Sequence, residues 1–575
     1  MKFRVWAPEA TSVELLLAET TCAMTQDSSG WWEAAPPVTG PGHRYQFRIN
    51  GGPPLPDPRS PWQPEGVHGP SVTWDHAAYQ WNDTGWNARP LSEAVLYELH
   101  IGTFTPEGTY AAASQKLPHL RALGITHIEL MPLAAFPGER GWGYDGVSLY
   151  APHPAYGTPD ELKALVDAAH GHGIAVLLDV VYNHLGPDGN YLGACAPYFT
   201  DHVRTPWGEA VNFSGPFSDE VRAFFIDNAL MWLRDYHFDG LRLDAVHAIF
   251  DETAIHFLEE LAGRVEELGA TCNRRLVLIA ESDLNNPRLV HSHHLGGYGL
   301  DAHWIDDFHH ALHAYFTGDR TGYYADYGSL ADVAKALRQA YVFDGQYSNF
   351  RKRHHGRPPI DVRPSQLIVY SQNHDQTGNR ALGDRTSHLA GPASLKAIAA
   401  LTLLSPFVPM LFQGEEWAAS TPFLYFTDHV DKALGRRITQ GRLREFAGFD
   451  WPASGPPDPQ DRRTFERSKL SWPELTDPAH AGILAWHAAL LALRRDQLLP
   501  SANRAAPDVR VHFDEPAGWL TLQRGNLLVL CNFSTEPRRI PHPSGAWNVQ
   551  LCSSGITPPK MIPIPPKTTR IAIRS

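Results

Sequence analysis

Cysteine is scarce in this chain of 575 residues: there are five, an odd number, scattered along the sequence and never spaced as Cys-x-x-Cys. Secreted domains that depend on disulfides are rich in cysteine, and zinc sites use closely spaced cysteine or histidine ligands, with HExxH as a common helical form. The sequence contains no HExxH. We therefore expect no disulfide framework, no metal or other cofactor, and a reducing, cytoplasmic setting.

Long apolar runs and clusters of basic residues are missing as well. No stretch reaches the roughly 18 apolar residues that a membrane-spanning helix needs. The first residues, Met1–Trp6, lack the apolar run of a signal peptide. The 49 Lys and Arg against 62 Asp and Glu give a net charge of −13, whereas phosphate binding depends on clustered cations. These absences argue against a membrane or a nucleic acid as a partner.

Aromatic and histidine side chains, in contrast, are plentiful, with 17 Trp and 30 His. The apolar face of a sugar ring stacks on an indole while its hydroxyls seek polar groups, so this composition suits a carbohydrate-binding cleft. Part of the tryptophan belongs to an ordinary core, because hydrophobic residues make up 43% of the chain. The length exceeds that of one usual core and predicts two or three domains.

The texture of the sequence changes twice and indicates three domains. Residues 1–90 alternate short apolar runs, such as Val13–Leu17, with Gly/Pro turns, which predicts an N-terminal β-sandwich. Residues 91–498 alternate strand-like and helix-like segments. After a helical stretch, Ala479–Arg495, residues 499–575 show short strands between Pro-rich turns and predict a C-terminal β-sandwich.

The middle domain carries alternating strand and helix patterns. Such alternation predicts parallel strands joined by helical crossovers, and eight units indicate a closed (β/α)8 TIM barrel. A doubly wound open sheet would give similar local patterns, and the sixth strand is the weakest of the eight. The helical patterns include Pro159–His172, Asp219–Asp235 and Glu252–Leu268. The eight strand candidates are Val95–His100, Thr126–Met131, Ala175–Val180, Gly240–Asp244, Leu276–Ala280, Ala302–Ile305, Leu367–Ser371 and Pro409–Phe412.

Polar residues follow four of these strands, at the end where barrel enzymes place their sites. The four segments are Asp179–His184, Gly240–His247, Ile279–Ser282 and Gln372–Gln376. Each alone has an ordinary explanation, since an Asp after a strand is commonly a helix cap, a lone His is commonly just hydrogen-bonded, and an Arg can pair with a buried acid. Their arrival in order at one rim favours a functional site.

The acids of that rim, Asp244, Glu281 and Asp375, are the residue types that cleavage of a glycosidic bond needs. One carboxylate attacks or stabilises the anomeric carbon, and one carboxylic acid protonates the leaving oxygen. Burial and a neighbouring carboxylate can keep that acid protonated near neutral pH. Arg242 lies two residues before Asp244, on the same strand face, where its charge would keep Asp244 ionised.

These segments resemble the four short sequence regions of the α-amylase family, glycoside hydrolase family 13, and the resemblance extends over most of the chain. It implies action on α-glucosidic bonds with retention of configuration. Asp244 matches the family's nucleophile, Glu281 its general acid/base and Asp375 its transition-state carboxylate. The residues implied to surround the reacting sugar are Trp142, Tyr144, Asp179, His184, Arg242, His247 and His374.

Within the family, an N-terminal sandwich similar to a carbohydrate-binding module is typical of branching, debranching and trehalose-releasing enzymes. The segments Glu129–Val147, Leu241–Ile249 and Phe412–Trp417 are similar to those of the maltooligosyltrehalose trehalohydrolase group. This resemblance implies cleavage of the α-1,4 bond beside a terminal trehalosyl unit, with maltooligosyltrehalose as substrate, trehalose as product and a maltooligosyltrehalose synthase acting earlier. Candidates for selecting trehalose lie at or after the eighth strand, each with a structural alternative: Glu415, Glu416, Trp417 and Asp428.

Two departures from common α-amylases bear on the ligands. Val246-His247 stands where many of them have Lys-His, which puts amylase-type contacts to a reducing end in doubt. The insertion after the third strand offers only Asp188, Asp201 and Glu209 as carboxylates, few for the about six to eight oxygen ligands of calcium. We therefore expect no required calcium.

Three other functions stay open at this point. A glycogen branching enzyme would use the same acids to rearrange amylose, and a debranching enzyme would cleave α-1,6 bonds. Some amylase-like barrels are non-catalytic interaction modules, but gaps in the catalytic set would be expected of these, and all three acids are present here.

Overall fold

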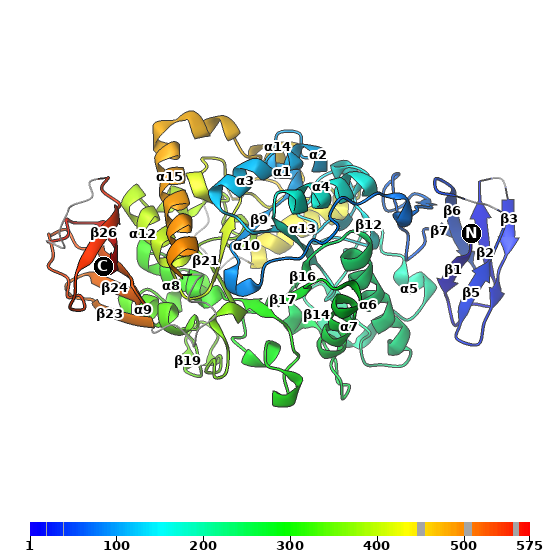
Figure 1. Cartoon of the computed structure of the whole chain (residues 1–575). Helices are drawn as coiled ribbons and strands as arrows, with labels where there is room; N and C mark the ends of the chain where they lie inside the picture. The colour runs from blue at the N-terminus through cyan, green and yellow to red at the C-terminus, as the bar shows by residue number, and fades with distance from the viewer. Residues whose placement is uncertain (19, 38–39, 446–454, 499–508, 556–562, 575) are drawn as a thin grey trace.

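The structure of the chain, a computed structural model, describes residues 1–575 apart from 19, 38–39, 446–454, 499–508, 556–562 and 575. Three β-rich parts follow one another across the molecule in Figure 1. The N-terminal strands, in blue, lie at one end, the barrel with its helices lies in the middle, and the C-terminal sheet, in red, lies at the other end.

The N-terminal part is a sandwich of two small sheets, as the alternating pattern predicts. Alternate side chains of β2 are buried, so each strand contributes one face to a shared core that includes Val13, Leu15 and Trp32. One sheet has the order β1(Phe3–Trp6), β5(Trp31–Ala34), β4(Thr25–Gln26). The other has the order β3(Thr20–Ala23), β2(Val13–Leu17), β6(Arg44–Ile49), β7(Pro54–Leu55), with β8(Ser71–Val72) also paired to β6.

Eight parallel strands close into a barrel in the middle of the chain. This confirms the predicted (β/α)8 barrel and excludes the open sheet. Each strand lies within one residue of its predicted bounds at both ends, and the weakest candidate, the sixth, is the three-residue strand β18. The strands are β9(Leu96–Leu99), β10(His127–Leu130), β13(Ala175–Val180), β16(Gly240–Leu243), β17(Val277–Ala280), β18(Ala302–Trp304), β21(Leu367–Tyr370) and β22(Val408–Phe412).

Inward side chains fill the barrel, so it is a packed core rather than a pore. They are mostly apolar near the amino ends of the strands and become polar toward the carboxyl ends. The apolar set includes Leu96, Leu177, Val277, Ile279, Ala302, Trp304, Ile368, Tyr370, Val408 and Met410.

Helices cover the outside of the barrel, including α4(Pro159–Gly171), which starts at a capping box made by Thr158. The predicted helix Glu252–Leu268 is wrong at its start, because α7(Phe257–Cys272) begins at Phe257. The N–H of Phe257 donates a hydrogen bond to the carboxylate of Asp251 at 2.6 Å. The other helices described are α1(Ile101–Phe104), α2(Tyr110–Ser114), α3(Leu117–Leu123), α5(Leu192–Cys195), α6(Ser218–Asp235), α8(Asp306–Thr317), α9(Leu330–Gln339), α10(His374–Gly378), α11(Thr386–Leu389), α12(Pro392–Leu403), α13(Lys432–Glu445), α14(Arg462–Arg467) and α15(Pro478–Leu493).

The C-terminal part follows α15, whose bounds are close to the predicted Ala479–Arg495. We expected a sandwich, and the described residues show one five-stranded antiparallel sheet. The sheet docks on the barrel through Arg338 of α9, which donates to the carbonyl of Val511 at 2.7 Å. Its strand order is β23(Val509–Asp514), β24(Trp519–Arg524), β25(Leu527–Asn532), β27(Thr568–Arg574), β26(Trp547–Cys552).

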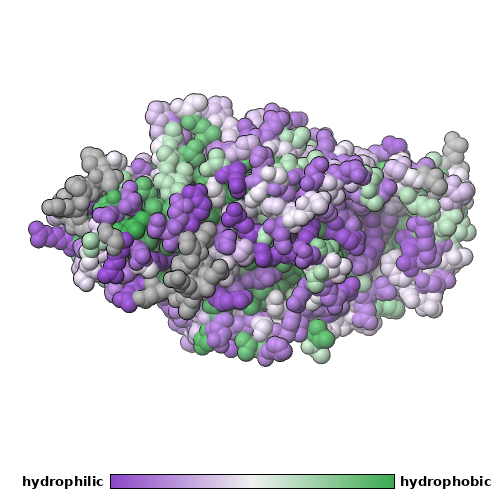
Figure 2. Space-filling view, in the orientation of Figure 1, coloured by the Kyte–Doolittle hydropathy of each residue, from purple (hydrophilic) through white to green (hydrophobic). Residues whose placement is uncertain are grey.

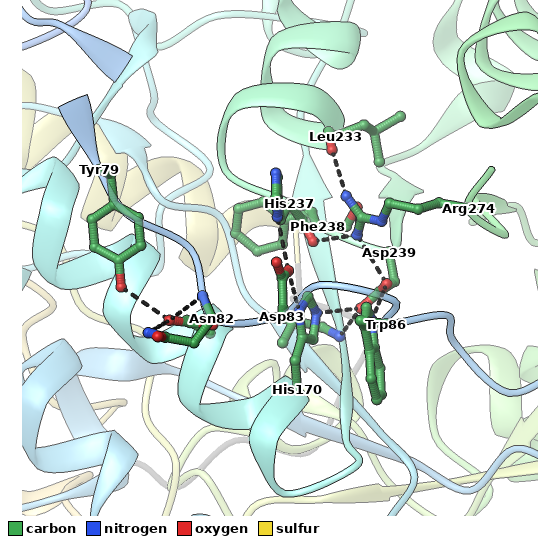
Figure 3. A network of polar contacts seen from close by, with 12 residues as sticks. Tyr79, Asn82, Asp83, Trp86, His170, Leu233, His237, Phe238, Asp239 and Arg274 are labelled. Atoms are coloured by element: carbon green, nitrogen blue, oxygen red, sulfur yellow. Dashed lines mark hydrogen bonds and ion pairs between the residues drawn. The ribbon is translucent and has the colours of Figure 1, made fainter. Parts of the chain in front are cut away.

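The chain between β8 and β9 is fastened to the amino end of the barrel by a buried polar network (Figure 3). His170 on α4 lies between two carboxylates, with Nδ1 2.9 Å from Asp83 and Nε2 2.9 Å from Asp239, which directly precedes β16. Trp86 donates to Asp239 at 2.8 Å and stacks on the His170 ring. The linker is thus held at the floor of the barrel, opposite the rim.

Hairpins rise around the carboxyl ends of the strands and build that rim. They are β11(Ala134–Ala135) with β12(Ser148–Pro152), β14(Phe199–Thr205) with β15(Gly208–Val211), and β19(Tyr347–Ser348) with β20(Arg353–His354). The face shown in Figure 2 carries mostly hydrophilic residues, with hydrophobic ones in separate smaller areas. Among the described residues, no helix combines the length and the apolar character needed to cross a bilayer.

Candidate active site

Arg242 lies at the centre of the candidate site, buried on the inward face of β16. Its Nη1 is 2.8 Å from both carboxylate oxygens of Asp179, its register partner on β13, and 2.9 Å from Oδ1 of Asp244. Its Nη2 is 3.2 Å from Oε2 of Glu281. The ring of Trp304 packs against the guanidinium at 4.3 Å. One cation therefore joins three of the predicted acids.

The backbone directly after the nucleophile candidate is strained, and this strained conformation orients the acid/base candidate Glu281. Asp244 and Glu281 directly follow β16 and β17. Ala245 then adopts a left-handed conformation with φ of 38°, which is unfavourable for a residue with a Cβ. This conformation directs its N–H to Oε2 of Glu281 at 2.7 Å. Backbone and Arg242 together fix the direction of the Glu281 carboxylate.

Burial and like charges perturb the acids around Arg242. Burial, followed by the charge of Glu281, raises the pKa of Asp244 to about 8, although Arg242 lowers it. Burial also raises the pKa values of Asp179 and Asp375, against the effect of nearby cations. Close carboxylates disfavour each other's ionised forms, so at Asp244 burial and neighbouring acids act against Arg242, which favours the ionised form.

His374 is held beside the site by Glu98, a buried acid on β9. Nδ1 of His374 contacts one carboxylate oxygen of Glu98, and its N–H donates to the other at 2.8 Å. Burial lowers the pKa of His374, but Glu98 outweighs this effect and the net shift is upward. The imidazole stacks on Tyr144 at 5.2 Å, and the Tyr144 hydroxyl donates to Asp179 at 2.6 Å.

Asp375, the next residue, stands in α10 and is partly exposed. Its Oδ1 accepts a hydrogen bond from Asn379 at 2.7 Å. Trp142 is buried, donates to the carbonyl of Leu424 at 2.9 Å and meets the His374 ring edge-on. The structure thus gives Trp142 a supporting position behind His374, while Asp375 stays open toward the rim.

Two predicted histidines lie at the edge of the site. Nε2 of His184 is 3.0 Å from the carbonyl of Tyr144, and its ring stacks on Trp207 with the planes 7° apart. Trp207, in the turn between β14 and β15, is 48% exposed and was not predicted. His247 is exposed on the 3-10 turn after Asp244. His184 is thus buried beneath the exposed Trp207, whereas the side chain of His247 is open to solvent.

Sequence reasoning missed Glu98 and Asp306, which also point to the rim. Glu98 is inside an apolar strand candidate, and its partner His374 lies 276 residues away. Asp306 follows β18, the weakest strand candidate, and its place at the carboxyl end of that strand is the signal that identifies it.

The residues described contain no group of three or more His, Cys, Asp or Glu side chains arranged to hold a metal ion. The arrangement around Arg242 can instead supply a nucleophilic carboxylate, a proton donor and a hydroxyl-binding carboxylate at one place.

Three family models match the chain. The alpha amylase catalytic domain matches residues 79–198, carbohydrate-binding module 48 (isoamylase N-terminal domain) matches residues 1–62, and a domain of unknown function matches residues 504–560. A malto-oligosyltrehalose trehalohydrolase from Arthrobacter ramosus is 49% identical over 549 residues, 95% of each chain. One from Mycobacterium tuberculosis is 47% identical over 94% of each chain.

The chain belongs to the malto-oligosyltrehalose trehalohydrolase family. The crystal structure of a presumed alpha amylase from Salmonella typhimurium resembles it with a TM-score of 0.91 and 38% identity, covering 100% of this chain and 97% of the other. A pullulanase from Anoxybacillus at 19% identity, with a TM-score of 0.73, shares the fold.

In this member of the trehalohydrolase family, three of the four candidates for selecting trehalose make contacts with other residues of the barrel instead of pointing into the site. Glu416 is fully buried and accepts hydrogen bonds from Tyr97 at 3.1 Å and from His119 at 3.0 Å. Glu415 accepts from Ser371 and from the N–H of Phe412. These contacts favour the structural alternative for both.

Trp417, the third of them, is also fully buried and packs on Trp472. Asp428, the remaining candidate, forms an ion pair of 2.8 Å with Arg140 and accepts the N–H of Glu139 at 3.0 Å. It is partly exposed and anchors the loop that continues to Trp142 and Tyr144. Asp428 therefore shapes the rim, whereas Trp417 belongs to the wall of the barrel.

Proposed function

We propose that this chain hydrolyses the α-1,4-glucosidic bond next to the terminal trehalosyl unit of maltooligosyltrehalose, releasing trehalose with retention of configuration. The supporting observation is a complete set of carboxylates joined by Arg242 at the barrel rim, in a chain 49% identical to a malto-oligosyltrehalose trehalohydrolase over 95% of both lengths. The trehalosyl unit is the leaving group of this reaction.

In the first step, a carboxylate oxygen of Asp244 attacks the anomeric carbon of the glucosyl unit beside trehalose. The bond to the trehalosyl oxygen breaks, its electron pair stays on that oxygen, and Glu281 supplies the proton. In the second step, Glu281 removes a proton from water, the water oxygen bonds to the anomeric carbon, and the bond to Asp244 breaks. Arg242, 2.9 Å from Asp244, favours the ionised form of this nucleophile against the burial that raises its pKa.

Sugar binding completes the proposal. Asp375 and His374 would hold hydroxyls of the reacting ring, and Tyr144 would lie under its apolar face. The exposed indole of Trp207, stacked on His184, offers a platform at the edge of the site. His247 lies on the same edge, after the nucleophile.

The substrate must come from an enzyme that converts the reducing-end linkage of a maltooligosaccharide into an α,α-1,1 bond, a maltooligosyltrehalose synthase. We further propose that the chain works in the cytoplasm, where its five free cysteines are ordinary. We also propose domain boundaries near residues 90 and 498, on either side of the barrel and its last helix.

One assay tests this function. Purified protein is incubated with maltotriosyltrehalose and, separately, with amylose, and the products are identified by chromatography. We expect trehalose and maltotriose from the first substrate. The Asp244→Asn variant serves as the matched control, since it keeps the fold and removes the nucleophile. Absence of trehalose, or rearrangement of amylose into branched chains, would reject the proposal.

A further inference from the structure

A second concave surface lies at the amino end of the barrel, between α4 and the linker that precedes β9. It spans about 650 Å³, within the range of about 300–1,000 Å³ that small-molecule sites occupy. It is lined by linker residues, including Tyr79, Asp83 and Trp86, and by residues of α4, including Ala164 and Asp167. We call it the linker pocket. It lies at the opposite end of the barrel from the carboxylates of the rim, and no step of the proposed reaction uses it.

Trp86 is held rigidly at the linker pocket (Figure 3). Its indole N–H donates to Asp239 at 2.8 Å, and one face of the ring stacks on His170, with centroids 4.5 Å apart and planes 14° apart. The side chain nevertheless stays partly exposed. A ring that is fixed at its nitrogen and on one face can offer its other face to a ligand, and it loses little conformational freedom when the ligand binds.

A second aromatic side chain and an available hydrogen-bond acceptor lie beside Trp86. Tyr79 is partly exposed, and its hydroxyl donates to Asp167 at 3.5 Å. Oδ2 of Asp83 is 2.9 Å from Nδ1 of His170 and 2.8 Å from Nδ1 of His237. Oδ1 of Asp83 accepts no hydrogen bond within the described part of the chain. This oxygen is therefore free to accept a hydrogen bond from a ligand, on a carboxylate that two histidines hold in place.

The residues of the linker pocket favour a neutral ligand that carries many hydroxyls. The carboxylates of Asp83 and Asp167 would repel an anion. A metal ion is not favoured, because both ring nitrogens of His170 already contact carboxylates, and the described residues hold no group of side chains arranged to bind one. A sugar ring combines an apolar face, which stacks on an aromatic side chain, with edge hydroxyls, which donate to carboxylates.

We propose that the linker pocket is a second carbohydrate-binding site, which holds an α-linked glucan chain on the Trp86 ring at the opposite end of the barrel from the catalytic rim. The choice of an α-glucan rests on the proposed function, because the substrate of that reaction carries a chain of α-linked glucose units. A long glucan that is bound here keeps its other chain ends close to the enzyme, which raises their effective concentration at the rim.

Three variants separate binding in the linker pocket from the stability of the linker. Trp86→Ala removes the aromatic platform. Ala164→Gln places a longer side chain in the pocket from an exposed position on α4, and it leaves the linker and its hydrogen bonds intact. Trp81→Ala is the matched control, because Trp81 is another partly exposed tryptophan of the same linker, stacks on His237 at 3.7 Å and does not line the pocket.

The measurement is native electrophoresis in gels with and without soluble starch, with every protein also carrying Asp244→Asn so that no chain is cleaved. We expect Trp86→Ala and Ala164→Gln to need about tenfold more starch than the parent for the same retardation, and Trp81→Ala to behave like the parent. Without Asp244→Asn, the Ala164→Gln variant should keep the kcat/KM of the wild type on maltotriosyltrehalose, because this short substrate occupies only the rim. Thermal unfolding of each variant reports the fold.

Retardation of Ala164→Gln by starch that equals that of the parent would overturn the inference. An equal loss of kcat/KM on the short substrate would also overturn it, because the substitution would then act on the catalytic rim. If Trp86→Ala does not fold, Ala164→Gln decides alone. Failure of the proposed function looks different, because the wild type would then release no trehalose from maltotriosyltrehalose, while the starch gels would still compare binding without any hydrolysis.

Discussion

Nη1 of Arg242 lies 2.8 Å from each carboxylate oxygen of Asp179, and both side chains are buried on neighbouring barrel strands. The same nitrogen is 2.9 Å from Asp244. Asp179 therefore competes with Asp244 for one cation, and its charge is one of the causes that raise the pKa of Asp244. The ionisation of Asp244, the proposed nucleophile, therefore depends on Asp179, an acid that has no role at the reacting bond.

Asp179→Asn should lower kcat/KM by roughly 10- to 100-fold, the effect of weakening a charge-assisted hydrogen bond. With Asp179 neutral, Arg242 attracts Asp244 more strongly and less negative charge surrounds it, so the pKa of Asp244 falls. The acid limb of the pH profile should then move to lower pH. Stability should change little, because Arg242 keeps Asp244 and Glu281 as partners. Asp361→Asn, in an exposed loop, is the control, and an acid limb that stays in place would contradict the linkage.

The Asp244 and Glu281 pair permits a test of which acid has which role. Glu281→Gln should lower kcat on maltotriosyltrehalose by about 10²- to 10⁴-fold, the usual contribution of general acid catalysis. With α-maltotriosyl fluoride, whose leaving group needs no protonation, the loss in the first step should be much smaller. Asp244→Asn should lose on the order of 10³-fold or more with both substrates, because attack itself is removed.

Steady-state rates with the two substrates, and single-turnover rates of the first step, measure these effects. If Asp244→Asn regained activity with the fluoride, Asp244 would be the proton donor and not the nucleophile. Equal losses for Glu281→Gln on both substrates would show that Glu281 does not protonate the leaving group.

The barrel was predictable because its strands are buried on both faces and show as short apolar runs. β13 has the predicted bounds, Ala175–Val180, and the carboxyl ends of β13, β16 and β17 carry the predicted acids. The start of α7 was not predictable, because it depends on Asp251, whose carboxylate pairs with Arg222 at 2.7 Å on another helix. Such long-range pairs leave no local pattern.

A position at a strand end places a residue at the rim, but it does not tell whether the side chain points into the site or into the barrel wall. After β22 the chain forms a 3-10 turn, Glu415–Trp417, whose side chains fold back into the barrel wall. Glu416 thus meets Tyr97 of β9 rather than a sugar. In the same way, Glu98 could not be connected with His374 before the closure of the barrel brought them together.

Glu129 offers a stability test inside the barrel. It is fully buried, and neither carboxylate oxygen has a hydrogen-bond partner among the residues that the structure describes. Burial, then the charge of its register partner Glu98, raises its pKa well above the ordinary value. An acid whose pKa is raised on folding costs stability as the pH rises above its unfolded pKa, because the folded state then holds the extra proton.

Glu129→Gln removes this dependence without changing the shape of the side chain. We expect the melting temperature of the variant relative to wild type to rise between pH 5 and pH 8, by the equivalent of about 1 kcal/mol or more. Thermal unfolding at the two pH values measures it, with the exposed Glu267→Gln as a control. The same difference at both pH values would mean that Glu129 is ionised in the folded protein.

His170 should make the attachment of the linker dependent on pH (Figure 3). Burial lowers its pKa, but hydrogen bonds to Asp239 and Asp83 outweigh this and raise it, while the pKa values of both acids are lowered. The imidazolium contributes stability that is present below its unfolded pKa and is lost as the pH rises through the folded value. The two carboxylates contribute stability that is lost as the pH falls below their unfolded pKa. The network is therefore strongest between about pH 4 and 6.5.

His170→Ala leaves two buried carboxylates facing each other across the gap and should cost about 3–5 kcal/mol. The loss in melting temperature should be largest at pH 5 to 6 and smaller at pH 9, where the wild type has itself lost the proton. Exposed His294→Ala is the control. Because the network lies at the amino ends of the strands, kcat of the folded variant at low temperature should stay close to that of the wild type. A loss in melting temperature that is equal at pH 5 and pH 9 would show that His170 acts by packing against Trp86 rather than by its charge.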